Sequence, residues 1–311
     1  MASAQNLKRR IKSVTNIGTI TKAMELVAAT KMRRSEELAL TSRPYAYTAL
    51  ELLGILADLK EVTLPELLRP REVKRTAFVL VTSDKGLAGS FNSSVIKQFE
   101  SFMKKGAIDV SDPDHSFIAI GQKAKNYLGR KKVNIVASFH HVGDFTEPEE
   151  TDPVAEFLIS GYLEHDFDSA IVFFSTFVTA LRQDAVAREF LPVTYDAVKQ
   201  SIEDTIPRAG KYSDYARSES FFEGRDKEYI IEPSPAEVLA ELAPKLLKTR
   251  IYHAILEANA SEHSARRMAM KNASENASDL SQTLNLEYNK SRQAAITNQI
   301  IEVTSGAITA T

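Results

Sequence analysis

The sequence predicts an α/β protein in which the two ends of the chain pair as a long antiparallel coiled coil beside a central α/β domain. Residues 1–60 and 234–311 both carry the apolar periodicity of long helices. Both ends are nearly free of aromatic residues: the first in the chain is Tyr45, and beyond Tyr252 only Tyr288 remains. A narrow helix pair favours small side chains, whereas residues 73–232 alternate strand-like and helix-like segments.

The N-terminal helix is predicted from apolar residues spaced three or four positions apart. This spacing places one apolar stripe along a helix and suits a left-handed supercoil. We expect the stripe to consist of Leu7, Ile11, Val14, Ile17, Ile20, Met24 and Val27. Pro44 should kink or break the helix, after which the periodicity resumes over residues 50–57.

The C-terminal helix has a recognisable start, because Ser234 is a capping residue followed by Pro235 and Glu237 at favourable positions. Pro244 predicts a kink. A helix of about 75 residues, with a rise of about 1.5 Å per residue, would extend roughly 110 Å. Its packing face is predicted from small residues at every fourth position and the apolar residues that follow: Ala265, Ala269, Ala273, Ala277, Leu280, Leu284, Ile296, Ile300, Val303 and Ala307.

The central domain is predicted to be Rossmann-like. Apolar runs at 75–82, 117–120, 133–138 and 170–175 are expected strands, and segments near 93–104, 122–128 and 154–165 are expected helices. This alternation favours a parallel sheet with right-handed crossovers. Residues 203–227 are polar, contain Pro207, Gly210 and Gly224, and are predicted to form a loop or insertion.

Composition excludes several classes of function. The chain has 311 residues, a formal charge of −2 and no cysteine, so disulfides, thiolate catalysis and thiolate metal sites are ruled out. No apolar run reaches the roughly 18 residues of a spanning helix, and we expect no secretory signal. Residues 1–34 hold eight Lys or Arg against one acid, Glu25. Nucleic-acid binding is disfavoured because no aromatics are interleaved; the charged outer face of a coiled coil is the simpler interpretation.

The loop from Ser83 to Gly89 is the one candidate ligand site, since it follows the first strand and precedes a helix. It lacks both the dinucleotide fingerprint and the P-loop pattern, so a tight structural turn is favoured over phosphate binding. His140 and His141, with Asp144 close by, do not have metal-ligand spacing. No catalytic motif is present. The sequence therefore predicts no enzyme activity of its own, no cofactor and no metal.

Three parts of the chain resemble the gamma subunit of F-type ATP synthases. The N-terminal segment is residues 20–29 (ITKAMELVAA) with 31–33 (KMR), and the central one is 83–87 (SDKGL) with Phe91, Asn92, Tyr229, Glu232 and Pro233. The C-terminal matches are residues 261–266 (SEHSAR), 269–270, 288–290 and 292–297 (RQAAIT). The likeness covers nearly the whole chain in order.

The resemblance implies a mechanical role. In this family the helix pair stands inside a ring of three alpha and three beta subunits, and the α/β domain sits on the c-ring beside the epsilon subunit. Proton-driven rotation of the c-ring turns gamma, which drives the beta subunits through their catalytic states. Gamma itself holds no nucleotide, and its membrane association is indirect, through the c-ring. The implied location is the cytoplasmic face of a bacterial inner membrane, with an organellar inner membrane as the alternative.

The resemblance also implies contact residues. Contacts with the beta subunits are expected from Met24, Lys31, Arg33, Arg34, Arg292, Gln293 and Thr297, and contacts with the c-ring from Tyr229 and Glu232. The alternative for each is surface solvation or coil packing. Ala88, Ser90 and Gln299 depart from common family residues, and the absence of cysteine excludes the redox-regulated chloroplast type. Two other functions stay open: a structural coiled-coil adaptor without a motor role, and an enzyme using the loop at Asp84–Gly89.

Overall fold

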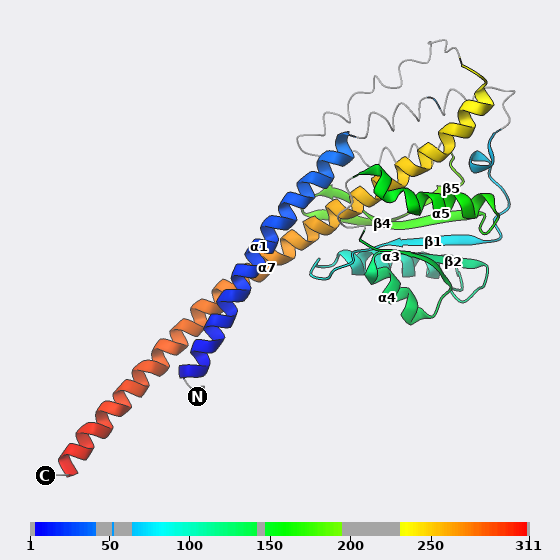
Figure 1. Ribbon diagram of the computed structural model, residues 1–311. Coiled ribbons are helices and arrows are strands. Elements are labelled where there is room, and N and C mark those ends of the chain that lie inside the picture. The colour runs from blue at the N-terminus through cyan, green and yellow to red at the C-terminus, as the bar shows by residue number, and fades with distance from the viewer. Residues whose placement is uncertain (1–3, 42–51, 53–63, 142–146, 195–230, 310–311) are drawn as a thin grey trace. The chain divides into compact units, whose positions relative to one another are not determined.

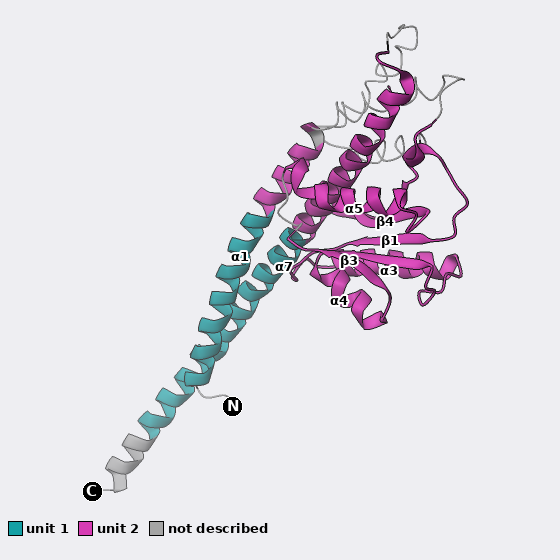
Figure 2. Cartoon of the chain, turned by 45° about the vertical axis from the view of Figure 1, so that its right-hand side comes forward, with its two compact units in different colours: residues 1–28, 266–311 teal, residues 29–265 magenta. Residues whose placement is uncertain are grey.

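The computed structural model describes residues 4–41, 52, 64–141, 147–194 and 231–309. The chain divides into two compact units, one formed by residues 1–28 with 266–311 and the other by residues 29–265 (Figure 2). The predicted break at Pro44, the helix over 50–57 and the loop over 203–227 lie outside the described residues. Among the described residues, no helix is both long and apolar enough to cross a membrane.

The first unit is the expected antiparallel helix pair. Helix α1 (Ala4–Thr41) supplies its first part and the 75-residue helix α7 (Pro235–Thr309) its last part, and the two lie side by side (Figures 1 and 2). Helix α7 begins as predicted, because the backbone N–H of Glu237 donates to Ser234 Oγ at 3.3 Å and the Ser234 hydroxyl donates to Glu237 Oε1 at 2.8 Å. It continues through Pro244.

The interface of the pair differs from the predicted stripe. Leu7, Ile11 and Val14 are buried or half-buried as expected, but the seam then continues through Gly18, Thr21, Glu25 and Ala28. The prediction was wrong for three residues, which are 50–59% exposed: Ile17, Ile20 and Val27. On α7 the prediction holds for Ala277 and Leu284, whereas Leu280, Ile296 and Ile300 are exposed.

Close approach of the two helices explains the shift of the seam. A Cβ atom built on Gly18 would lie 3.4 Å from the Cβ of Ala277, and the Ser274 hydroxyl donates to the Gly18 carbonyl at 3.4 Å. At this separation a branched side chain would not fit between the helices. Small residues therefore meet where Gly18 faces Ala277, and the neighbouring Ile17 and Ile20 face outward.

Replacing Ala277 by leucine should lower the unfolding free energy of the helix pair by about 1–3 kcal/mol, because the larger side chain must force the helices apart. Thermal unfolding followed by circular dichroism measures the change. Leu280→Ala is the control, since Leu280 is 45% exposed and its truncation should cost about 0.5 kcal/mol or less. Equal melting temperatures for Ala277→Leu and the unsubstituted chain would contradict the close seam.

The second unit contains a five-stranded sheet in the order β3-β2-β1-β4-β5. Its strands are β1 (Thr76–Val81), β2 (His115–Ile120), β3 (Ile135–Phe139), β4 (Ser169–Thr179) and β5 (Arg182–Leu191). The first four pair in parallel, as predicted, and β5 pairs antiparallel to β4. The sequence analysis did not predict β5.

Helices cover both faces of this sheet (Figure 1). Helices α3 (Phe91–Lys105) and α4 (Gln122–Lys131) close one face over a core centred on Phe78, Phe117 and Phe173. Helix α5 (Asp152–Leu163) and the first part of α7 close the other face. Two short 3-10 helices, η1 (Glu66–Leu68) and η3 (Pro148–Thr151), complete the described elements. Sheet and helices form the expected Rossmann-like arrangement.

Candidate partner-contact surface

Residues 292–301 of α7 are exposed on all sides. The seam ends at the half-buried Ser291, and every residue from Arg292 to Ile301 is exposed. Helix α7 therefore continues beyond its partner α1, as Figure 1 shows. A helix that is exposed along this length offers its whole circumference to other molecules.

Three predicted contact residues lie together on this exposed part. Arg292, Gln293 and Thr297 are all exposed, and the Thr297 hydroxyl donates to the Gln293 carbonyl at 2.9 Å. This bond ties the threonine hydroxyl back to the helix. The guanidinium of Arg292 and the side-chain amide of Gln293 are therefore the groups that can extend toward a partner. A guanidinium and an amide on adjacent positions can donate several directional hydrogen bonds to a partner.

Met24 lies far from that cluster. Because Gly18 lies opposite Ala277 in an antiparallel pair, Met24 falls near residue 271, about twenty residues before Arg292. At a rise of about 1.5 Å per residue this is roughly 30 Å along the shaft. The sequence analysis grouped Met24 with Arg292; the structure does not bring them together. Met24 is half-buried beside the seam.

The basic residues expected to meet a partner lie on the last part of α1, in the second unit. Arg33 and Arg34 are exposed and Lys31 is half-buried. Glu232 is exposed immediately before α7, whereas Tyr229 lies outside the described residues. The structure thus leaves most of these side chains open to solvent, as a contact role requires.

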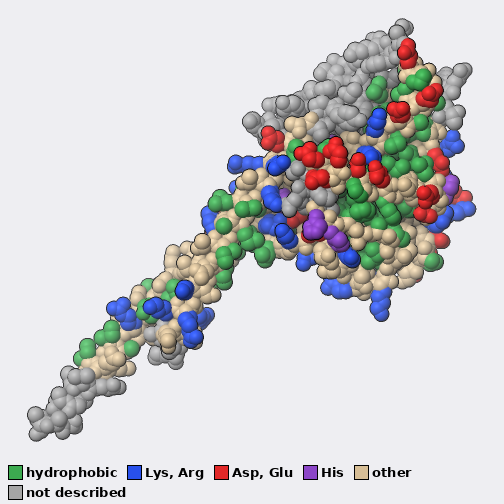
Figure 3. All heavy atoms as spheres, viewed as in Figure 1, with side chains coloured by type: hydrophobic (Ala, Val, Ile, Leu, Met, Phe, Trp, Pro, Cys, Tyr) green, Lys and Arg blue, Asp and Glu red, His purple; other side chains and the backbone are tan. Residues whose placement is uncertain are grey.

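The exposed apolar residues of the helix pair form a surface that the sequence analysis missed, since it assigned most of them to the seam. Figure 3 shows apolar and basic side chains alternating along the visible face of the pair. The residues are Ile17, Ile20, Leu26, Val27, Leu280, Leu286, Ile296, Ile300 and Ile301. Exposed apolar side chains that recur along a helix pair are candidates for contact with a partner. Five exposed cations of α1 accompany it: Lys8, Arg9, Arg10, Lys12 and Lys22.

Polar groups of the candidate ligand loop, Ser83 to Gly89, form hydrogen bonds within the protein. The Ser83 backbone N–H donates to Asn92 Oδ1 at 3.0 Å. The Asp84 carboxylate accepts from the backbone N–H groups of Gln122 at 3.0 Å and His141 at 2.8 Å. These bonds join the ends of β1, α4 and β3, which supports the structural turn. Within the described ranges, no group of three or more His, Asp or Glu side chains is placed to hold a metal ion.

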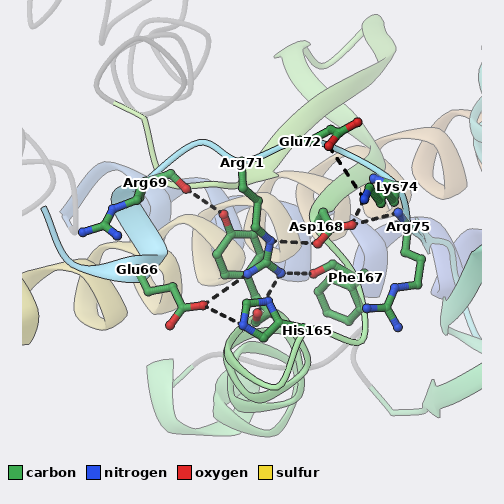
Figure 4. Close-up of polar contacts among 10 residues, drawn as sticks. Glu66, Arg69, Arg71, Glu72, Lys74, Arg75, His165, Phe167 and Asp168 are labelled. Atoms are coloured by element: carbon green, nitrogen blue, oxygen red, sulfur yellow. Dashed lines mark hydrogen bonds and ion pairs between the residues drawn. The ribbon is translucent and has the colours of Figure 1, made fainter.

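A polar cluster at the amino ends of β1 and β4 was also missed by the sequence analysis (Figure 4). Arg71 Nε lies 2.8 Å from Asp168 Oδ1, and Arg71 Nη2 donates to the carbonyls of Tyr162 and Phe167 at 2.9 and 2.7 Å. The guanidinium stacks 4.1 Å above the Tyr162 ring. Its bonds to backbone groups on several segments indicate a structural clamp. No sequence motif marks it, because its members come from residues 66–75 and 162–168.

The electrostatics of the clamp favour an ionised Asp168. Burial, the largest single influence, opposes ionisation, but hydrogen bonds from the backbone N–H groups of Arg75 and Lys74 and the charge of Arg71 together outweigh it. The pKa of Asp168 is therefore lowered from its usual value.

Within the described residues, a helix pair with exposed apolar and basic side chains and a Rossmann-like α/β domain define a coiled-coil protein of mixed α/β class. Two solved structures share the fold. The chain of the Tetrahymena thermophila mitochondrial ATP synthase central stalk and c-ring matches with a TM-score of 0.55 at 23% identity, covering 82% of this chain and 99% of that one. A chain of the Euglena gracilis mitochondrial ATP synthase in rotational state 3 matches with a TM-score of 0.62 at 16% identity, covering 99% and 94%.

Sequence comparisons show the family. The family model described as ATP synthase matches residues 3–309. The ATP synthase gamma chain of Desulforamulus reducens is 37% identical over 307 residues, and that of Moorella thermoacetica 35% identical over 307, each match covering 99% of both chains. The chain belongs to the ATP synthase gamma-chain family. The resemblance and the fold class expected from the sequence are confirmed.

Proposed function

We propose that this chain is the central rotor shaft of a proton-translocating F-type ATP synthase, coupling rotation of the c-ring to the catalytic cycle of the beta subunits. The observation that carries the proposal is membership of the gamma-chain family over residues 3–309. The geometry supports it, because a helix pair with exposed apolar residues on its outer surface, and with one helix continuing beyond the other, is suited to enter a partner. The adaptor alternative accounts for the helices but not for the family.

The outer surface of the helix pair suits rotation inside a sleeve. Contacts between apolar surfaces are non-directional, so they change little in energy as one surface slides past the other. Directional polar contacts would instead favour particular angles. Because α7 extends beyond α1, the end of the shaft is a single helix and the rest is a pair of helices. The surface that the shaft presents to surrounding subunits is therefore asymmetric.

The contact residues act at two levels in this proposal. Arg292, Gln293 and Thr297 form the level near the tip, where they would bond to loops of the beta subunits. Met24 belongs to a second level on the helix pair. The cations Lys31, Arg33 and Arg34 would pair with an acidic element of beta, an attraction that tolerates sliding because it acts over a distance. Tyr229 and Glu232 would meet the c-ring.

The proposed partners are three alpha and three beta subunits, the epsilon subunit and the c-ring. ATP is made and hydrolysed on the beta subunits, so this chain is a non-catalytic subunit of the complex. It would be held at the membrane as a peripheral subunit, through the c-ring. The gamma chains of the bacteria Desulforamulus reducens and Moorella thermoacetica match over 99% of their length, which favours the cytoplasmic face of a bacterial inner membrane.

Reconstitution tests the proposal directly. The chain is mixed with its cognate alpha and beta subunits, and Mg-ATP hydrolysis and subunit stoichiometry are measured. We expect a complex with three alpha, three beta and one copy of this chain, whose hydrolysis requires the chain. A chain that neither joins the ring nor changes its hydrolysis would rule out the shaft and favour the adaptor.

Replacing Arg292 and Gln293 together by alanine should lower coupled ATP synthesis by about tenfold, the effect of losing about 1.4 kcal/mol of directional contact. Both residues are exposed, so assembly and thermal stability should be nearly unchanged. Gln282→Ala, an exposed amide elsewhere on α7, is the matched control and should synthesise ATP normally. Normal synthesis by the double variant would remove the torque role of this pair.

A further inference from the structure

Helix α7 is fixed to the β4–β5 hairpin by polar bonds at two separate places in the second unit. At the first place the guanidinium of the buried Arg250 donates to the Phe190 carbonyl at 3.1 Å and to the Glu189 carbonyl at 2.7 Å. It also lies 4.4 Å above the Phe190 ring. The strand register shifts here: Ala170 pairs with Leu191 but Ile171 with Glu189, so Phe190 is an extra residue of β5. Arg250 therefore binds the carbonyl groups of β5 at the point where a β-bulge interrupts its regular pairing with β4.

The second place is near the tip of the hairpin. The hydroxyl of the fully buried Ser261 donates to the Ser175 carbonyl at 3.1 Å. The hydroxyl of the equally buried Ser264 donates to the Ala180 carbonyl at 2.7 Å and accepts from Gln183 Nε2 at 3.3 Å. The strand register shifts here too, between Phe177 and Thr179. Both irregular parts of the hairpin are thus bonded to α7.

The two places lie along one face of the helix. Ser261 and Ser264 follow Arg250 by eleven and fourteen positions, close to three and four full turns. At about 1.5 Å per residue, the distance from Arg250 to Ser264 is roughly 21 Å. The buried Ala254 and Ala258 lie between them. Small side chains there bring the helix close to the sheet, which is what allows two short serine side chains to reach backbone carbonyls.

We propose that Arg250, Ser261 and Ser264 form a torque anchor, which prevents α7 from rolling on the sheet and passes rotation of the α/β domain into the shaft. The inference rests on the rotor function proposed above. Apolar packing also holds the helix on the sheet, but a hydrogen bond is more sensitive to a small rotation, because it weakens steeply when its alignment is lost. Rolling of α7 about its axis would misalign both sets of bonds together. These are positioning residues; the chemistry takes place on other subunits.

The anchor can be tested by measuring torsional stiffness. The chain contains no cysteine, so Lys105→Cys, at the exposed end of α3, gives a unique attachment point for a bead on the α/β domain. In a surface-fixed complex with alpha and beta subunits, held by a non-hydrolysable ATP analogue, the angular variance of the bead reports the stiffness between shaft and domain. In Ser261→Ala/Ser264→Ala we expect the variance to rise about twofold or more, because three directional bonds between α7 and the hairpin are lost.

A second readout separates positioning from general damage. Mg-ATP hydrolysis by the anchor variant should stay within about twofold of the unsubstituted complex, since the helix pair that works on the beta subunits is unaltered. Thr249→Ala is the matched control: it removes a hydroxyl from the same stretch of α7, but one that bonds the helix's own Lys245 carbonyl at 2.8 Å. It should leave the variance unchanged.

The outcomes are distinguishable. An unsubstituted complex that forms but whose bead does not rotate in ATP would contradict the rotor function itself. A complex that rotates, with equal variance in the double variant and in Thr249→Ala, would overturn the anchor alone. If the double variant fails to assemble, Arg250→Lys takes its place, because one ammonium cannot reproduce the two-carbonyl fork. Failure of both to assemble would show that these bonds hold the domain together, which also overturns the anchor.

Discussion

Replacing Gly121 by alanine should lower the free energy of unfolding of the α/β unit by about 3–5 kcal/mol, among the largest effects of a single methyl group. Gly121 joins β2 to α4 with φ of +88°, a conformation that residues with a Cβ rarely adopt. A Cβ built there would lie 2.1 Å from the Thr82 carbonyl oxygen and 2.8 Å from its carbon. The backbone N–H of Gly121 also donates to the Phe139 carbonyl at 2.8 Å, which holds the residue in place.

The clash involves backbone on both sides, so no side chain can rotate to relieve it. Urea unfolding followed by circular dichroism measures the loss. Gly129→Ala on α4 is the matched control, because a Cβ there meets nothing within 4 Å and alanine favours a helix by roughly 1 kcal/mol. We expect opposite signs for the two variants. Equal losses would show that the tight turn after β2 is not needed for the fold.

The long helices and the parallel strands were predictable because each is encoded locally, by periodicity and by caps such as Ser234. The seam of the helix pair was not. Periodicity identifies apolar residues, and it assigned Ile17 and Ile20 to the interface; the structure instead places the half-buried Gly18 and the buried Thr21 there. The deciding quantity is the distance between the two helices, which depends on the small residues of both and cannot be read from either alone.

Strand β5 was missed for a related reason. Its sequence from Arg182 to Leu191 mixes charged residues with alanine and valine, and most of it is half-buried at the edge of the sheet. An edge strand paired on one side needs no long apolar run. The contact roles of Arg292 and Gln293 are a different case: the structure shows that both are exposed, and their partner bonds stay predictions that only the assembled complex can test.

Replacing Arg71 by methionine should lower the free energy of unfolding of the α/β unit by about 3–5 kcal/mol at neutral pH. Methionine keeps most of the apolar stem but removes the charge opposite the buried Asp168, leaving that carboxylate without its cation. The carbonyls of Tyr162 and Phe167 also lose their donor. Asp168→Asn and the double variant Arg71→Met/Asp168→Asn complete a double-mutant cycle. Because the double variant has no unpaired charge, we expect it to be more stable than Arg71→Met alone.

The cost of Arg71→Met should shrink as the pH falls. In the unsubstituted protein the pKa of Asp168 is lowered on folding, so its ionised form stabilises the fold above the unfolded-state value of about 3.9. That contribution is lost as the pH falls through the lower, folded-state pKa. Without Arg71 the folded-state pKa of Asp168 rises, and the variant relieves its unpaired charge by taking up a proton. Urea unfolding at about pH 7 and at about pH 4.5, which is just above the ordinary carboxyl range, measures the effect. The difference in unfolding free energy between the unsubstituted protein and Arg71→Met should be larger at pH 7. A difference independent of pH would mean that Arg71 acts through its backbone bonds and its stacking on Tyr162, and not through its charge.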